Sequence, residues 1–331
     1  MMTGLHEVFV LDVGHGNCTI LRSDEVVSVM DAPTKSILLD TLRQLEIKNI
    51  DAIFVSHSDK DHIAGVGSLL SSNDVTVKSL YLNPDSTKGP GSPWHDLRVL
   101  AADARNRYGL TVYTALTTDS PKTVPIGSAT VEVLAPTPEF IMGGAGSVDL
   151  GGKHQLNSNS VSVVLRIKFG GKPLFLLPGD LDSFGLDAMT NELDDASAEV
   201  LLFPHHGGLP GSTDPEVFAR KVCQLVSPKV VIFSNSRTLY SNPRPEIVKG
   251  VRSVSTAVVA CTELSKQCCE STDGINYSHL ASLPAYGHKS AACCAGTMRF
   301  CLKELTEENL ICLAKHSEFV EKQIVTAICK R

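Results

Sequence analysis

The sequence predicts an α/β protein in which two β-sheets pack face to face between two layers of helices, a four-layer αββα sandwich. Apolar stretches with strand-like spacing alternate with amphipathic stretches of helical spacing along most of the 331 residues. The alternation runs twice, and each half begins with closely spaced strands and continues with strand–helix units. Two such halves favour one layered sandwich over two independent domains.

The first strands and helices of the chain set the pattern. We predict strands at 7–13, 18–21 and 26–30, whose short spacing indicates an antiparallel meander. Residues 36–45 carry apolar side chains at helical spacing, and the largely apolar run 50–55 suits a strand buried on both faces.

The later segments continue this alternation. We predict helices at 63–70, 94–108, 183–194, 215–223 and 245–254, and strands at 76–82, 111–114, 129–134, 160–169, 174–177, 199–203 and 230–233. The strands 160–169 and 174–177 form a hairpin through Gly170 and Gly171. Residues 143–152 contain five glycines, which predicts a flexible loop over a site.

Composition and charge narrow the class of protein. The chain is 43% hydrophobic and 20% charged, which excludes a disordered or collagen-like protein. We find neither an apolar run near the ~18–20 residues that span a bilayer nor a signal peptide, and we expect a cytoplasmic location. The formal net charge of −6 argues against binding nucleic acid by bulk charge alone, although bound metal ions would reverse the local field.

Four polar clusters follow predicted buried strands directly. They are Asp31, the segment 57–62 with the pattern H-x-D-x-D-H, Asp180, and the pair His205–His206. Ligands and catalytic groups of α/β sheets lie at the carboxyl ends of strands. One turn with this pattern supplies two metal positions, Asp180 can bridge two cations, and His205 or His206 can complete the second position. Two divalent ions about 3.5–4 Å apart deprotonate a water and stabilise charge on the attacked group.

The segment H-x-D-x-D-H-I-A-G resembles the H-x-H-x-D-H signature of the metallo-β-lactamase fold, with Asp59 in place of the second histidine. Together with L-D-V-G-x-G near the start and P-H-H-G after the Asp180 motif, it is similar to the soluble hydrolase domain of the ComEC family of bacterial DNA-uptake channels. The resemblance runs from about residue 7 to residue 250 and includes Asn159 and the segment 240–243. The chain departs from that branch at 14–17, which read G-H-G-N instead of G-Q-G-D, and at Asn242, where the branch has a histidine.

The resemblance implies a two-metal hydrolase, most simply a phosphodiesterase or nuclease that uses a metal-bridging hydroxide. His57, Asp59 and Asp180 would hold one ion; Asp61, His62, Asp180 and His205 or His206 would hold the other. Asp61 and His62 are the predicted catalytic residues, and Asp61 would also orient the hydroxide. The oxygen ligand Asp59 favours Mn²⁺, while the mixed site still accepts Zn²⁺. The predicted supporting or substrate-contacting residues are Asp31, Asn159, Lys153, Arg237, Tyr240 and Asn242.

Two other functions stay open at this stage. The same hydroxide can attack the carbonyl of a small-molecule ester, thioester or lactone, and a non-catalytic assembly module can keep the fold. We expect nucleic acid or another phosphodiester as substrate, no membrane insertion, and a protein partner of unknown identity. A stand-alone hydrolase of this type also fits a bacterial multi-component system, for example in defence.

The C-terminal part differs in composition. Eight of the 10 cysteines lie from Cys261 onward. We predict a catalytic domain over 1–255 and a cysteine-rich extension over 256–331 that packs on the same sandwich, with a strand at 296–305 and a helix at 307–328. One interpretation of Cys261, Cys269, Cys293 and Cys294 is a structural zinc site, although no C-x₂-C pair is present; the other is that these thiols pack as small apolar side chains.

Overall fold

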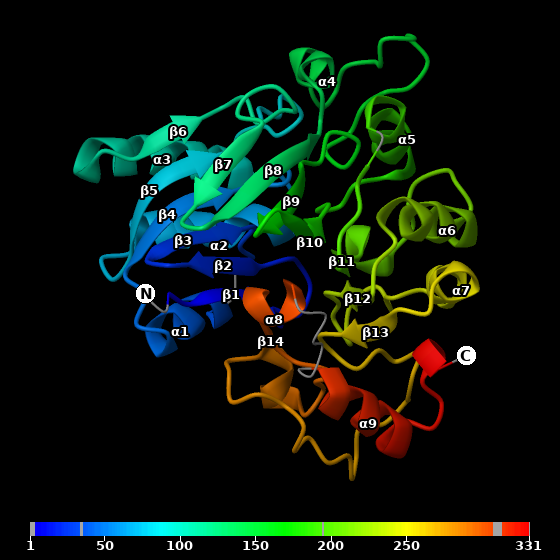
Figure 1. Ribbon diagram of the computed structural model, residues 1–331. Helices are drawn as coiled ribbons and strands as arrows, with labels where there is room; N and C mark the ends of the chain where they lie inside the picture. The colour runs from blue at the N-terminus through cyan, green and yellow to red at the C-terminus, as the bar shows by residue number, and fades with distance from the viewer. Residues whose placement is uncertain (1–3, 34–35, 194, 307–312, 331) are drawn as a thin grey trace.

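The computed structural model describes residues 4–33, 36–193, 195–306 and 313–330, and it confirms the four-layer sandwich. Two seven-stranded sheets pack face to face, with helices on both outer faces (Figure 1). The strand order is β14-β1-β2-β3-β4-β5-β6 in the first sheet and β13-β12-β11-β10-β9-β8-β7 in the second.

The first sheet begins with the predicted meander. Strands β1 (His6–Val10), β2 (Thr19–Ser23) and β3 (Val26–Met30) are antiparallel. From β3 onward the pairing is parallel, through β4 (Asn49–Phe54), β5 (Thr76–Tyr81) and β6 (Thr111–Tyr113). Because β3 and β4 run in the same direction, the residues after them meet at one edge of the sheet.

The second sheet has the same plan. Strands β7 (Thr123–Ile126), β8 (Ala129–Ala135), β9 (Val164–Phe169) and β10 (Lys172–Leu177) are antiparallel, and they include the predicted hairpin. Strands β11 (Val200–Leu202), β12 (Val230–Phe233) and β13 (Val258–Cys261) then follow in parallel. The ends of β10 and β11 therefore also meet at one edge.

Three apolar cores hold the layers together. Side chains such as Val8, Phe54 and Phe175 fill the space between the sheets. The outer face of the first sheet is covered by α1 (Ile37–Gln44), α2 (Lys60–Ser71) and α3 (Pro93–Tyr108). The outer face of the second sheet is covered by α5 (Ser183–Glu192), α6 (Pro215–Val226), α7 (Pro245–Val254) and α9 (Ala314–Gln323).

The segment after residue 255 contributes to both sheets. Strand β13 pairs with β12 at one edge, and β14 (Met298–Cys301) pairs antiparallel with β1 at the edge of the other sheet. Residues 256–331 thus supply an edge strand to each sheet, as Figure 1 shows. The domain boundary at 255 stays a prediction.

The predicted strand 296–305 is wrong in its second half. Strand β14 ends at Cys301, and α8 (Leu302–Thr306) follows at once. Leu302 and Leu305 are both buried, and this spacing of three residues places them on one face of a helical turn.

The predicted helix 307–328 is also shorter in the structure. Its first six residues lie outside the described part, and α9 ends at Gln323. Residue 194, the last of another predicted helix, likewise lies outside it.

Besides α8, neither the strands β7 and β13 nor one short helix was predicted. Strand β7 contains Pro125, which lacks the N–H that an inner strand must donate, but β7 lies at the edge of its sheet, where this lack is tolerated. The short helix α4 (Pro138–Gly143) precedes the glycine-rich loop. Among the described residues, no helix is both long and apolar enough to cross a membrane.

Candidate metal centre

The four polar clusters meet at one edge of the sandwich, where β3, β4, β10 and β11 end. Asp31 follows β3, the 57–62 segment follows β4 and opens α2, Asp180 follows β10, and His205 and His206 follow β11. Three of these residues, Asp31, His205 and His206, have a positive φ of 53–57°. Such left-handed backbone is uncommon outside glycine and recurs at functional sites, where it aims a side chain.

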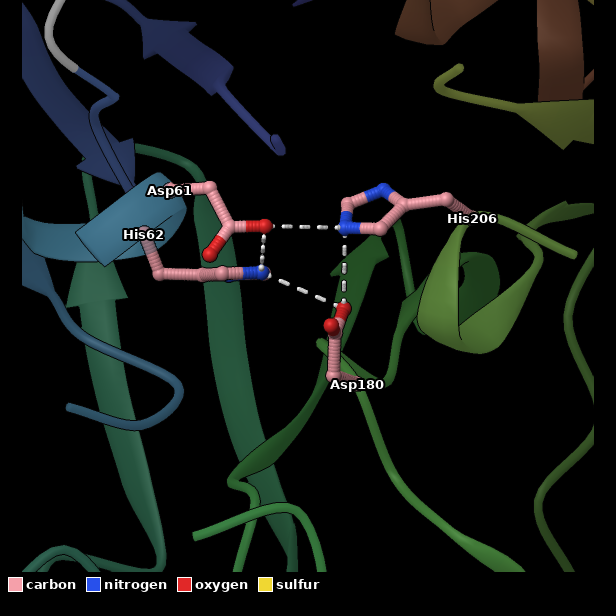
Figure 2. A group of neighbouring side chains, drawn as sticks. All are labelled: Asp61, His62, Asp180 and His206. Carbon is pink, nitrogen blue, oxygen red and sulfur yellow. Dashed lines mark ion pairs between the residues drawn. The ribbon is translucent and has the colours of Figure 1, made fainter. Parts of the chain in front are cut away.

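Asp61, His62, Asp180 and His206 form the centre of this edge (Figure 2). One donor atom from each lies within 4.8 Å of the other three. The Nε2 atoms of His62 and His206 lie 3.2 and 3.3 Å from Asp180 Oδ1, and 3.7 and 3.5 Å from Asp61 Oδ2. Two imidazoles and two carboxylates at this spacing are a ligand set for a divalent metal ion.

Three donor atoms of this group have no hydrogen-bond partner. His62 Nε2, His206 Nε2 and Asp180 Oδ1 are all buried without one. A buried polar atom left in this state destabilises the fold by about 1–3 kcal/mol, so native proteins rarely keep several together. A cation between the four side chains would satisfy all of these atoms at once, so the residues fit a metal ion.

Hydrogen bonds on the far side of each ring fix which nitrogen faces the centre. His206 Nδ1 lies 2.8 Å from the carbonyl oxygen of Ser234, which can only accept, so this nitrogen carries the hydrogen. His62 Nδ1 lies 2.7 Å from Asp31 Oδ2 in the same way. Asp31 is itself held by the backbone N–H and the hydroxyl of Ser56, at 2.8 and 2.7 Å. This support orients Nε2 of both histidines toward the centre, as in metal sites with a carboxylate behind the ligand.

The pKa shifts at the centre show that its surroundings favour positive charge. Burial alone would lower the pKa of His206, but Asp180 and Asp61 outweigh burial and raise it to about 9. Burial would raise the pKa of Asp180, yet His206 and His62 hold it well below its usual range. Both carboxylates therefore stay ionised and draw a cation, either a proton on histidine or a metal ion.

A second group of donors lies beside the first. His57 Nε2, which is also buried without a hydrogen-bond partner, lies 3.6 Å from Asp59 Oδ2. The half-buried His205 has its Nε2 4.0 Å from Asp180 Oδ2, the oxygen opposite the one that faces His62 and His206. Sequence reasoning left open which of the two adjacent histidines joins the Asp61 group; in the structure it is His206.

One neighbour of the centre, His15, was not predicted as a site residue from the sequence. His15 Nε2 lies 3.0 Å from Asp61 Oδ2, and the His15 ring packs against His206 and Tyr240 with centroids 4.6 and 4.7 Å apart. The turn that carries His15 passes so close to Asp61 that a Cβ on Gly16 would lie 2.4 Å from the Asp61 carbonyl oxygen. The signal for His15 was its place after β1, at the same edge as the other clusters.

The other unforeseen residues are Asp85 and Lys88, in the loop after β5. The buried Asp85 accepts hydrogen bonds from the hydroxyls of Ser58 and Ser158. Lys88 Nζ lies 2.5 Å from Asp59 Oδ1. Neither residue carries a sequence signal, because the loop is far from the 57–62 segment along the chain.

The predicted supporting residues lie in several places. Arg237 is turned away from the centre, because its guanidinium donates to the carbonyl oxygens of Leu264, Cys269 and Glu270. Asn159 has a buried Oδ1 without a partner, and the carbonyl of the buried Asn242 accepts from Asn235. Lys153 is exposed and lines a groove of about 880 Å³ along α5 that reaches Asp182, two residues after Asp180. The glycine-rich loop bounds this groove.

The four cysteines of the zinc interpretation do not gather at one point. Cys261 and Cys294 line a narrow apolar cavity of about 10 Å³ together with Cys268 and Cys329. The thiol of Cys293 instead lies 3.6 Å from Asp12 Oδ2, and Cys269 is half-buried. Within the described ranges, the one group of three or more metal-ligating side chains is the Asp61 group. The zinc site stays a prediction without a preformed ligand set.

Comparisons with known proteins agree with the resemblance predicted from the motifs. Residues 11–95 match the sequence model of the metallo-β-lactamase superfamily. ComE operon protein 3 of Bacillus subtilis (strain 168) is 27% identical over 216 residues, which are 65% of this chain and 24% of that protein. The chain therefore spans about a quarter of the length of this relative. Together these matches confirm the expected resemblance.

Solved structures with a related fold are more distant in sequence. The metallo-β-lactamase fold protein YhfI from Bacillus subtilis is 12% identical, with a TM-score of 0.49 over 77% of this chain and 96% of that one. A diphosphatase of the PhnP family is 15% identical, with a TM-score of 0.40 over 69% and 86%. The short form of human tRNase Z is 12% identical, with a TM-score of 0.40 over 70% and 93%. Likeness at this level says nothing about the substrate.

Proposed function

We propose that this hydrolase of the metallo-β-lactamase fold, which carries a potential divalent-metal site, is a phosphodiesterase or nuclease. One observation carries the proposal: the buried donor atoms of His62, Asp180 and His206 converge with Asp61 on one point and have no hydrogen-bond partner. A cation would stabilise such a group, and the carboxyl ends of strands are where α/β sheets bind their substrates.

Two ions fit the donors. Asp61, His62, Asp180 Oδ1 and His206 would hold one ion, and His57, Asp59 and Asp180 Oδ2 would hold the other, with His205 beside it. Asp180 faces both groups through its two oxygens, which suits a bridging ligand. The mixture of imidazole and carboxylate accepts Zn²⁺ and Mn²⁺. When bound, such ions activate water and stabilise charge that develops on a phosphoryl group.

The chain's own residues prepare this chemistry. Asp31 and the Ser234 carbonyl keep Nε2 of His62 and His206 turned inward, so the ligands do not have to reorient. Asp61 Oδ2 lies within 3.7 Å of ring nitrogens of His62, His206 and His15, and Asp61 would orient the attacking oxygen. His205 is the more exposed of the adjacent histidines and can reach both the Asp180 side of the site and a substrate.

The choice of a phosphodiester rests on the resemblance to the ComEC hydrolase domain, whose expected substrate is nucleic acid. The acidic chain supports it indirectly, because the carboxylates of this edge are those that bound cations would neutralise. The cations at the edge then attract an anionic backbone in spite of the net charge of −6.

A metal-resolved assay tests the proposal. Metal-free protein is reloaded with Mn²⁺, Zn²⁺ or Mg²⁺ and assayed on bis(p-nitrophenyl) phosphate, on single- and double-stranded DNA and RNA, and on lactone and thioester substrates. We expect hydrolysis of phosphodiesters that depends on the metal and is lost in His62→Ala.

Two outcomes would overturn the proposal. Cleavage of carbonyl substrates alone would replace it with an ester, thioester or lactone hydrolase. An unchanged biological effect of the His62→Ala and Asp61→Ala variants would support a non-catalytic assembly module.

A further inference from the structure

A lysine from outside the four polar clusters reaches the metal centre. Lys88 lies in the loop between β5 and α3, and its Nζ lies 2.5 Å from Asp59 Oδ1. Asp61 and Asp180, in contrast, face histidines. The Lys88 and Asp59 side chains are 28% and 36% exposed, so this ammonium lies at the mouth of the centre, within reach of solvent.

The loop that carries Lys88 is held at defined points. Asp85 Oδ1 accepts from the backbone N–H and the hydroxyl of Thr87, at 2.8 and 2.5 Å, which closes a tight turn just before Lys88. Asp85 Oδ2 accepts from Ser58, the residue between His57 and Asp59, and from Ser158 at 2.8 Å. One buried carboxylate therefore ties the backbone near Lys88 to the metal-binding segment.

The glycine-rich loop holds the same turn from the other side. The backbones of Asp85 and Ala145 pair in an isolated parallel β-bridge, and Ser86 Oγ donates to the Ala145 carbonyl at 3.1 Å. The turn just before Lys88 is thus held from two sides, as expected of a loop that positions a residue for a ligand.

The Asp59 carboxylate separates Lys88 from the metal ligands. Its Oδ2 faces His57, and its Oδ1 faces Lys88. His57 Nε2 and Lys88 Nζ lie 3.6 and 2.5 Å from this carboxylate, one at each oxygen. An ammonium has three donors, so Lys88 can keep its ion pair with Asp59 and still donate a hydrogen bond to a second acceptor.

We propose that Lys88 is a substrate-binding residue that donates to a non-bridging oxygen of the scissile phosphate. The inference rests on the proposed phosphodiesterase function and deepens it, since it names an anionic group as the part of the substrate that is recognised. A lysine binds phosphate as a point charge, and here the charge adjoins the atoms that would hold a metal ion. The basic residues that the sequence pointed to fit this task less well, because Arg237 is taken up by backbone carbonyls and Lys153 lies along α5.

The test combines binding with kinetics in the full-length, metal-loaded protein. Lys88→Met removes the charge and keeps most of the side-chain length, and Lys88→Arg keeps the charge. We expect Lys88→Met to weaken binding of inorganic phosphate, measured by calorimetry, at least about tenfold, because a hydrogen bond to a charged group is lost. KM for bis(p-nitrophenyl) phosphate should rise by a similar factor with little change in kcat, and Lys88→Arg should retain most of the affinity.

Lys78→Met is the matched control. Lys78 makes an ion pair of the same length with Asp51, at 2.5 Å, but on the exposed surface of β5. This variant should bind phosphate and metal as the wild type does. Metal content, measured by mass spectrometry, should also be unchanged in Lys88→Met.

The outcomes distinguish a failure of the proposed role of Lys88 from a failure of the proposed function. Equal phosphate affinity in wild type and Lys88→Met, or no phosphate binding by the wild type, would overturn the role of Lys88. A change in metal content without a change in phosphate affinity would do the same, because Lys88 would then act on the metal ligands. Loss of phosphate binding in Lys88→Met, in a protein that hydrolyses no phosphodiester, would support Lys88 as an anion site and refute the proposed reaction.

Discussion

Two regions of the molecule gather side chains of the types that can bind metals, and these side chains have opposite surroundings in the two regions. At the sheet edge, Asp61, His62, Asp180 and His206 point donor atoms at one another, and those of His62, Asp180 and His206 have no hydrogen-bond partner. In the C-terminal region, Cys261, Cys268, Cys294 and Cys329 line a narrow apolar cavity, and the Cys294 thiol lies 3.2 Å from His316 Nε2.

The difference lies in charge and convergence rather than in residue type. Carboxylates at the sheet edge stay ionised and hold His206 at a pKa of about 9. Burial in the cysteine region raises the pKa of Cys261 and Cys294 well above that of a free thiol, so these groups stay neutral. A neutral buried thiol packs as a small apolar side chain, whereas an ionised buried carboxylate requires a cation.

The largest expected effect is at the residue shared by both donor groups. Asp180→Ala should lower metal-dependent activity at least about 10³-fold, since the bridging carboxylate and its charge are both lost. Activity and metal content per chain are the measurements, and a circular dichroism spectrum checks the fold. Retained metal at full stoichiometry would remove Asp180 from the ligand set.

The second-largest effect is expected at Asp31, whose carboxylate lies behind the His62 ring. Asp31→Asn keeps the shape of the side chain, and asparagine tolerates the positive φ of 57° at this position. Metal affinity should fall about 10–100-fold, because the carboxylate behind His62 is lost. Titration with Mn²⁺ followed by calorimetry measures it, and an unchanged affinity would show that the Asp31–His62 contact serves the fold alone.

In the cysteine region, the next expected effect is a pH dependence of the free energy of unfolding that comes from His316. Burial and the neighbouring His279 lower the pKa of His316 from 6.5 to about 4, so the unfolded chain binds a proton more readily than the folded one. The stability contributed by neutral His316 is present above pH 6.5 and is lost as the pH falls toward 4. Between pH 7 and pH 5 the free energy of unfolding should drop by about 2 kcal/mol from this residue.

Urea unfolding of wild type and His316→Gln at the two pH values measures this drop. The wild type should lose about 2 kcal/mol more than the variant between pH 7 and pH 5. Equal losses in both proteins would contradict a neutral buried His316.

The smallest expected effect is at the thiols. Cys261→Ala with Cys294→Ala should destabilise the fold by about 1 kcal/mol per site, as for the loss of one buried methyl-sized group. Zinc content and activity should not change. Loss of one zinc ion per chain in this double variant would instead establish a structural metal site in the cysteine region. The two regions would then no longer differ in metal binding.

Much of the sandwich was predictable because its elements carry local signals. The helix α7 (Pro245–Val254) has the predicted bounds, since Ile247, Val248 and Val251 lie at helical spacing. The ends of the strands β3 and β12 were also predicted correctly, since both runs are mainly apolar and stop at a polar residue. Local signals failed at β7, whose proline argues against a strand, and at 302–306, where no turn residue separates the strand from the helix.

The sequence by itself determined the residue types of the metal edge, because each cluster directly follows a buried strand and strand direction then brings the clusters to one edge. Only the tertiary structure decided that His206 joins the Asp61 group, that Arg237 turns away, and that His15, Asp85 and Lys88 complete the surroundings. These outcomes depend on left-handed backbone at His205 and His206 and on contacts between loops far apart in the chain. A side chain's direction at such a turn is set by the neighbours it meets in space, which no local pattern records.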